Sequence, residues 1–249
     1  KGVHPGYLEL CRSGEIEERI RILHAFYERC RLCPHECGVN RTRGEKGKCR
    51  SGSLPVVASH TVHHGEEPPI SGTHGSGTIF FSGCTGRCVF CQNYPISQLG
   101  TGNEITGKQL AEMMLGLQGR GCHNINLVTP THFSPSIVSA VADACERGLS
   151  IPIVYNTSGY ERPEIIELLD GVVDIYLPDA KYSDDIPAKE LSGFTRYTEF
   201  NAGSLKEMYR QVGDLVTDNN IAIKGLVIRH MILPGGLSGS GAVFHMIAN

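Results

Sequence analysis

The chain has no tryptophan, and its aromatic residues make up only 7% of the total. No apolar run approaches the roughly 20 residues that a membrane-spanning helix needs, so we expect no such segment. The charges nearly balance, with 23 Lys and Arg against 26 Asp and Glu and a formal net charge of -3. This balance offers no electrostatic argument for binding nucleic acid or an anionic membrane surface.

The remaining composition is that of a globular protein with a substantial core. A chain of 249 residues, 40% hydrophobic and 20% charged, fits one large α/β domain, alone or with a small appendage. Ten cysteines could indicate a secreted disulfide scaffold, but most of them fall in two close clusters with metal-ligand spacing. We therefore expect a reducing compartment and a cytoplasmic protein.

The most informative stretch is Cys84-Thr-Gly-Arg-Cys88-Val-Phe-Cys91, directly after a short apolar run. Three thiolates on one tight loop can bind three irons of a cubane iron–sulfur cluster, which leaves the fourth iron open to a substrate or cofactor. The alternative is a zinc knuckle or a set of buried structural thiols. No fourth Cys or His follows soon after Cys91, and this favours an open, reactive site over a closed one.

The region from residue 1 to about 75 is polar and cysteine-rich, with one amphipathic helix expected near Glu15 to Glu28. After this helix come Cys30, Cys33, Cys37 and Cys49, in the order C-x2-C-x3-C-x11-C. Four thiolates can close a tetrahedral zinc site that holds a polar region together, and zinc is the first choice. An auxiliary iron–sulfur cluster uses the same ligands, and His35 could replace one thiolate.

From about residue 76, short β-branched runs alternate with helical patterns, which predicts βα units and a parallel sheet. The expected strands are Thr78–Ser82, Asn124–Thr129, Ile153–Asn156, Val173–Pro178 and Lys224–Leu233. The expected helices are Gly107–Gly119, Pro135–Gly148, Pro163–Leu169 and Ser204–Val216, with a last helical run at Gly241–Asn249. Polar side chains gather where the strands end, as expected of a catalytic rim. They are Thr129, Thr131, His132, Asn156, Thr157, Ser158, Asp179, Lys181, Arg229 and His230.

The cluster loop resembles that of the radical S-adenosylmethionine (radical SAM) superfamily, which reads C-x3-C-x-aromatic-C, with Phe90 in the aromatic position. Within the superfamily, the chain resembles the pyruvate formate-lyase activating enzyme-like branch. The stretches that carry this resemblance are Cys-x2-Cys-Pro-x2-Cys-Gly from Cys30, Gly65-Glu-Glu-Pro-Pro-Ile-Ser-Gly, Cys91-Gln-Asn-Tyr-Pro-Ile-Ser, Val154-Tyr-Asn-Thr-Ser-Gly-Tyr, Asp174-Ile-Tyr-Leu-Pro-Asp-Ala-Lys-Tyr and Ile228-Arg-His-Met-Ile-Leu-Pro-Gly.

The resemblance implies an α/β fold, a partial (β/α)6 TIM-like barrel over residues 76–249, whose sixth strand would lie beyond Asn249, preceded by the metal-binding region 1–75. It implies a [4Fe-4S] cluster on Cys84, Cys88 and Cys91 and S-adenosylmethionine as the second cofactor. The expected activity is reductive cleavage of S-adenosylmethionine to methionine and a 5′-deoxyadenosyl radical. A non-catalytic electron carrier or a zinc-binding interaction module is the alternative.

Positions that match the family's motifs imply contacts to S-adenosylmethionine. They are Asn93, Asn156, Asp179, Lys181 and Arg229, and Thr129 is a further candidate contact that stands at a departure from those motifs. The family's Gly-Gly-Glu is absent where Val128-Thr-Pro-Thr-His stands, and Thr129 and Thr131 could substitute for it through hydroxyl or backbone contacts. The expected partners are a protein or small-molecule substrate and a flavodoxin- or ferredoxin-type reductant.

Overall fold

The computed structural model describes residues 4–248, and eight strands in this part of the chain form one mixed sheet in the order β3-β1-β2-β4-β5-β6-β8-β7. The strands are β1 (Val56–His63), β2 (Ser76–Phe81), β3 (Asn103–Glu104), β4 (Ile125–Val128), β5 (Ile153–Thr157), β6 (Ile175–Pro178), β7 (Val216–Asp218) and β8 (Ile221–Leu226). Strands β2, β4, β5, β6 and β8 pair in parallel, whereas β1, β3 and β7 join antiparallel at the two sides. The α/β architecture is consistent with the partial barrel that we expected.

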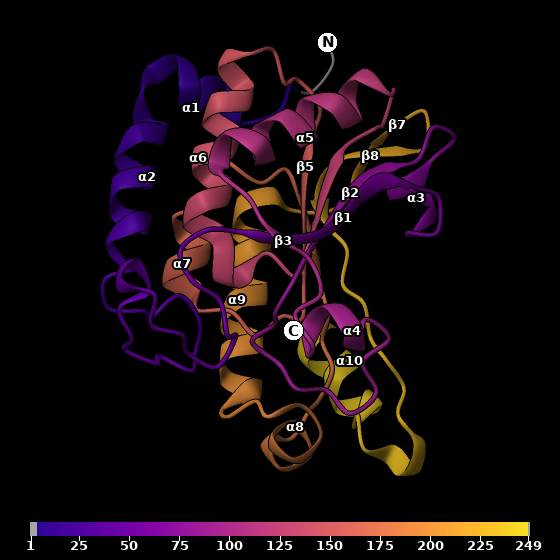
Figure 1. The fold of residues 1–249 in the computed structure, drawn as a ribbon. Coiled ribbons are helices and arrows are strands. Elements are labelled where there is room, and N and C mark those ends of the chain that lie inside the picture. Colours follow the sequence, from indigo (N-terminus) through magenta and orange to yellow (C-terminus); the bar gives the residue numbers. More distant parts are fainter. Residues whose placement is uncertain (1–3, 249) are drawn as a thin grey trace.

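Helices follow the parallel strands and cover the sheet. The α-helices are α1 (Tyr7–Ser13), α2 (Glu15–Ala25), α3 (Pro68–Ser71), α4 (Tyr94–Ser97), α5 (Gly107–Gly119), α6 (Ser134–Glu146), α7 (Pro163–Glu167), α8 (Asp185–Ser192), α9 (Tyr197–Val212) and α10 (Ser240–Ala248), and the short 3-10 helices are Arg41–Arg43, Thr131–Phe133 and Pro234–Gly236. Helices α1, α2 and α6 pack together on one side of the sheet (Figure 1). None of the helices among residues 4–248 is long and apolar enough to cross a membrane.

The predicted elements are largely present. All five expected parallel strands form, and helix α5 has the predicted bounds. The expected strand Lys224–Leu233 was wrong in its extent, since β8 covers Ile221–Leu226. The segment after β8 still runs beside β6, and an isolated bridge joins Arg229 to Asp179. Regular pairing ends because β6 ends at Pro178, which has no N–H to donate.

Two further differences follow from tertiary packing. Helix α9 begins at Tyr197, seven positions before the predicted Ser204, and its first turns bury Tyr197 and Asn201 against the loops after the strands. Strand β1, which lies inside the predicted amino-terminal region, was not expected because its residues are mostly partly exposed or polar. It pairs with β2, so both predicted regions share one sheet.

The segment between β1 and β2, which includes α3, packs against the inner face of the sheet. Ile70 on α3 is fully buried and packs against Val154, Ile175 and Leu177 from β5 and β6. Burying such side chains contributes roughly 1.5–3 kcal/mol each. This packing holds the residues just before α3, Glu66 and Glu67, beside the inner surface of the strands.

Candidate functional site

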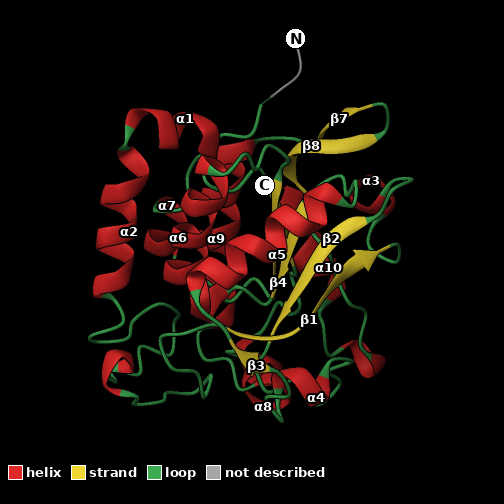
Figure 2. Ribbon diagram, turned by 45° about the horizontal axis from the view of Figure 1, so that its top comes forward, coloured by secondary structure: helices red, strands yellow, loops and turns green. Residues whose placement is uncertain are grey.

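The loop after β2 carries three free thiols, those of Cys84, Cys88 and Cys91. It lies at the same end of the sheet as α4, α8 and the long segment between α2 and β1 (Figures 1 and 2). Gly83 opens the loop with φ +80°, and a Cβ there would lie 2.7 Å from the carbonyl oxygen of Cys49. Glycine at this position therefore lets the two cysteine sets approach each other closely.

The surroundings of the three thiols fit thiolate ligation. The Gly86 N–H donates to Cys84 Sγ (3.3 Å), and Cys91 Sγ lies 3.1 Å from Ser97 Oγ. The pKa of Cys84 is raised to about 12, chiefly by burial and also by the neighbouring thiols of Cys88 and Cys91, whereas the Gly86 N–H and Lys181 lower it. Thiolates are the usual ligands of a cubane cluster, so the donor set fits that group.

No three His, Cys, Asp or Glu side chains within residues 4–248 stand close enough together to hold a metal ion as they are placed. The assignment of either cysteine set as metal ligands therefore stays a prediction. Among the thiols of the loop, burial also raises the pKa of Cys88, and Ser192 and Lys181 oppose that shift. Lys181 is thus an electrostatic neighbour of two of the three thiols.

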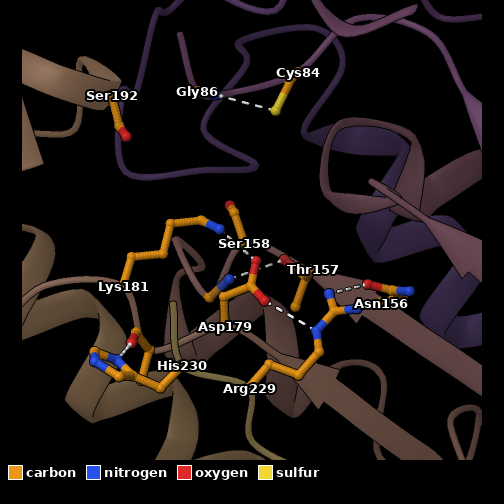
Figure 3. A network of polar contacts seen from close by, with 12 residues as sticks. Cys84, Gly86, Asn156, Thr157, Ser158, Asp179, Lys181, Ser192, Arg229 and His230 are labelled. Atoms are coloured by element: carbon orange, nitrogen blue, oxygen red, sulfur yellow. Dashed lines mark hydrogen bonds and ion pairs between the residues drawn. The ribbon is translucent and has the colours of Figure 1, made fainter. Parts of the chain in front are cut away.

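Four of the predicted cofactor-contact residues form one charged network at the ends of the strands (Figure 3). Asp179 lies between two cations: Lys181 Nζ donates to its Oδ2 (2.6 Å) and Arg229 Nε donates to its Oδ1 (3.0 Å). Arg229 Nη2 donates to Asn156 Oδ1 (2.6 Å). The ends of β5 and β6 and the segment after β8 thereby bring together residues that lie far apart in the sequence.

Helix α9 holds the backbone of this network in place. Tyr197 Oη accepts the Lys181 N–H (2.9 Å), and Asn201 Nδ2 donates to the carbonyl oxygens of Gly159 and Asp179 (3.0 Å each). A Cβ at Gly159 would lie 2.1 Å from the Asp179 carbonyl oxygen, so glycine is required at this close approach. Tyr197 and Asn201 were not predicted as site residues, because both lie before Ser204, where the helix was expected to begin.

Glu66 also belongs to the network, although it was not among the predicted contact residues. Its Oε2 accepts from Asn126 Nδ2 (2.8 Å) and Asn156 Nδ2 (2.9 Å), and its Oε1 lies 3.3 Å from Arg229 Nη1. Burial and the adjacent Glu67 raise the pKa of Glu66 to about 7, against the lowering effect of Asn126 and Arg229. Its position in the quoted stretch Gly65-Glu-Glu-Pro-Pro-Ile-Ser-Gly was the one signal that could have indicated it.

The other predicted contacts are placed differently. Asn93 is exposed at the start of α4, and its side chain makes no capping hydrogen bond. Thr129 follows β4 with φ +61°, a left-handed conformation that is costly for a β-branched residue and that occurs most often at functional sites. The Thr129 N–H donates to the Asn156 carbonyl oxygen (2.9 Å), so Thr129 adjoins the network through its backbone.

Thr131 and His132, which we expected on the rim, are buried instead. Thr131 Oγ1 donates to Glu161 Oε1 (2.5 Å). His132 Nε2 donates to the Ser82 carbonyl oxygen (2.9 Å), and burial lowers the pKa of His132 to about 3, so the ring is neutral. Each side chain therefore joins the segment after β4 to another part of the interior, Thr131 to Glu161 and His132 to Ser82.

The amino-terminal cysteines form a second group of neighbouring thiols. Cys30, Cys33 and Cys49 are buried and Cys37 is half-buried. Burial raises the pKa of Cys33 well above its usual range, and the thiols of Cys49, Cys30 and Cys37 add to that shift. His35 Nε2 hydrogen-bonds to the carbonyl oxygen of Thr85 (2.8 Å), which links this group to the loop after β2.

Comparison with known proteins adds two findings. The family model described as "Radical SAM superfamily" matches residues 78–235, more than half of the chain. The chain is also 30% identical, over 241 residues, to "Uncharacterized protein MJ0674" of Methanocaldococcus jannaschii. That alignment covers 92% of this chain and 64% of the relative, so the chain spans less than two thirds of the relative's length.

Proposed function

Because the chain belongs to the radical SAM superfamily, we propose that it is an enzyme that holds a [4Fe-4S] cluster on Cys84, Cys88 and Cys91 and cleaves S-adenosylmethionine reductively. When bound, these groups supply a 5′-deoxyadenosyl radical that abstracts hydrogen from a substrate. The observation that carries the proposal is the placement of three free thiols beside the charged network, with Lys181 an electrostatic neighbour of both Cys84 and Cys88.

The network retains free donors for an anionic ligand group. An ammonium has three donor hydrogens, and the hydrogen bond of Lys181 Nζ to Asp179 uses one of them. A guanidinium has five, and Arg229 uses three of them, on Asp179, Glu66 and Asn156. Lys181 and Arg229 can therefore orient a carboxylate such as that of the methionine moiety while Asp179 keeps them in position.

We propose that the chain belongs to the pyruvate formate-lyase activating enzyme-like branch, on the six stretches that carry the resemblance. The geometry agrees with this choice, because Glu66, Asn156, Asp179, Lys181 and Arg229 all come from those stretches and meet in one network. We propose a protein or small molecule as the substrate and a flavodoxin- or ferredoxin-type protein as the reductant.

For the amino-terminal cysteines we propose a closed four-thiolate site that holds zinc. Three of the four side chains are buried, and the Lys48 N–H approaches the fourth, Cys37 Sγ, at 3.4 Å. A site with four protein ligands leaves no open coordination position, as is typical of structural zinc. An auxiliary iron–sulfur cluster uses the same thiolates.

The test of the activity is anaerobic reconstitution with iron and sulfide, reduction with dithionite and chromatographic assay of S-adenosylmethionine for 5′-deoxyadenosine. Wild type and the control Cys145→Ala, which removes a free thiol on α6, are expected to form product. Cys88→Ala is expected to lose both the cubane absorbance and the product, because two thiolates hold the cluster poorly. Product formation by Cys88→Ala would contradict the proposal.

A further inference from the structure

A basic surface lies beside the loop of three thiols. One hollow of about 610 Å³ is lined by His35, Cys37, Gly47, Lys48, Arg50 and Arg87. A second hollow of about 240 Å³ shares Arg50 and also includes Lys46, Cys49 and Leu99. We name Lys46, Lys48, Arg50 and Arg87 the basic face. No acidic residue is among those that line either hollow in the described part of the chain.

The charges of the basic face are not neutralised by the protein itself. Within residues 4–248 none of these four cations lies within 4.0 Å of a carboxylate oxygen. Neutral acceptors orient two of them instead: Arg87 Nη1 donates to Gln98 Oε1 (2.8 Å), and Arg50 Nη1 donates to the Gln98 carbonyl oxygen (3.2 Å). Four cations without counter-ions, two of them oriented by these hydrogen bonds, form a local positive field on a chain whose net charge is -3.

The basic face includes side chains from the segments of both cysteine sets. Cys37 and Cys49 line its hollows, and Arg87 lies within the loop between Cys84 and Cys88. Arg87 Nη2 also donates to the Lys48 carbonyl oxygen (2.8 Å), which ties the amino-terminal segment to that loop. Leu99 adds an apolar side chain that is 66% exposed. An apolar contact flanked by cations is typical of a protein interface with a charged rim.

We propose that the basic face is the docking site of an acidic one-electron carrier protein, an inference that rests on the proposed function. Each docking event transfers one electron: the carrier is oxidised by one electron, the enzyme's metal centre is reduced by one, and no bond forms or breaks. Complementary charge increases the association rate and orients the carrier toward the thiol loop. Lys48, Arg50 and Arg87 line the first hollow and Lys46 lines the second, so the positive charge extends over two adjoining hollows, and this extent favours a protein surface over a small anion.

The experiment uses the reconstituted holoenzyme and a reduced flavodoxin as the probe. Binding is measured by surface plasmon resonance, and cluster reduction by stopped-flow absorbance, at low and high salt. Lys46→Glu combined with Arg50→Glu is expected to weaken binding and slow reduction by about tenfold or more, and high salt is expected to do the same to wild type. The matched control reverses the charge of two exposed lysines outside the basic face, Lys108→Glu with Lys206→Glu. It is expected to behave as wild type.

Dithionite serves as a small reductant that needs no docking. Product formation with dithionite, together with metal content and thermal unfolding, is expected to be the same for wild type, the double variant and the control. Equal flavodoxin binding by both double variants, or binding that does not respond to salt, would overturn the proposal. The proposal would also be overturned if the wild type bound inorganic phosphate, the double variant did not, and flavodoxin reduced the clusters of both at the same rate. If wild type forms no 5′-deoxyadenosine with dithionite, the proposed function is contradicted. The docking proposal is judged separately, because flavodoxin binding is its own measurement.

Discussion

Glu66 and Arg229, which are 163 positions apart in the sequence, form an ion pair with 3.3 Å between Oε1 and Nη1. The other oxygen of Glu66 accepts from the amide of Asn156, whose own oxygen accepts from Arg229. Glu66 therefore determines the orientation of two residues that we propose to contact S-adenosylmethionine. It is a positioning residue, since its own carboxylate is occupied by Asn126, Asn156 and Arg229.

Glu66→Gln is expected to weaken binding of S-adenosylmethionine about tenfold, because a glutamine amide must turn a donor toward either Arg229 or the asparagine amides. Equilibrium binding to the reconstituted protein measures the change. Glu67→Gln is the matched control, since Glu67 Oε1 lies 3.8 Å from Arg229, and we expect less than about a threefold effect there. Equal effects of the two substitutions would contradict the positioning role.

Cys33→Ala is expected to lower the metal content of the amino-terminal site and the solubility of the protein while leaving the spectrum of the cluster on Cys84, Cys88 and Cys91 in place. The physical reason is that a buried thiolate is removed from a closed site that holds its segment together. Metal analysis of zinc and iron and absorbance spectroscopy measure the outcome. A variant that keeps its solubility and loses only turnover would favour an auxiliary redox cluster at these cysteines.

Protonation of Glu161 is expected to make stability depend on pH. Burial raises its pKa from the ordinary 4.5 to about 7, against hydrogen bonds from Thr131 and Thr157 that lower it. At pH values between 4.5 and about 7, Glu161 keeps its proton in the folded protein and loses it in the unfolded chain. The resulting stabilisation is complete below about pH 4.5 and is lost as the pH rises through about 7.

Urea unfolding of wild type and Glu161→Gln at about pH 5 and about pH 8 tests this expectation. Wild type is expected to lose on the order of 2–3 kcal/mol relative to the variant between the two conditions. Glu164→Gln, an exposed neighbour, is expected to follow wild type. Parallel pH profiles for wild type and Glu161→Gln would show that Glu161 is already ionised in the folded protein at low pH.

Arg41→Ala is expected to destabilise the fold by about 3 kcal/mol, because Arg41 is only 1% exposed and connects three segments. Its guanidinium donates to the carbonyl oxygens of Gly52 (3.0 Å) and His132 (2.6 Å) and lies 4.5 Å from the centre of the Tyr27 ring. Chemical denaturation compares it with Arg43→Ala, an exposed residue two positions away, for which we expect a change within about 0.5 kcal/mol. Similar losses for both would contradict the role of Arg41.

Local patterns predicted the parallel strands and the polar residues at their ends. Runs such as Ile175–Pro178 are buried on both faces, and their continuous apolar character indicated parallel strands directly. Asn156, Asp179, Lys181 and Arg229 were expected on the rim because each stands at or near the end of such a strand or just after it, and the family resemblance implied their role as cofactor contacts. Glu66, Tyr197 and Asn201 could not be found in this way, since their roles come from contacts with distant segments.

The sequence by itself determined the two cysteine sets and the βα order, because ligand spacing and hydrophobic periodicity are properties of neighbouring residues. Only the tertiary structure decided which polar residues meet. Thr131 and His132 belong to the same short segment as Thr129, yet they point into the protein interior toward Glu161 and Ser82. Glu66 contacts Asn156, which lies 90 positions later in the sequence. The contact forms because Ile70 packs on the inner face of the sheet and so holds the loop of Glu66 beside β5. Such contacts depend on the registration of whole strands, which no local pattern encodes.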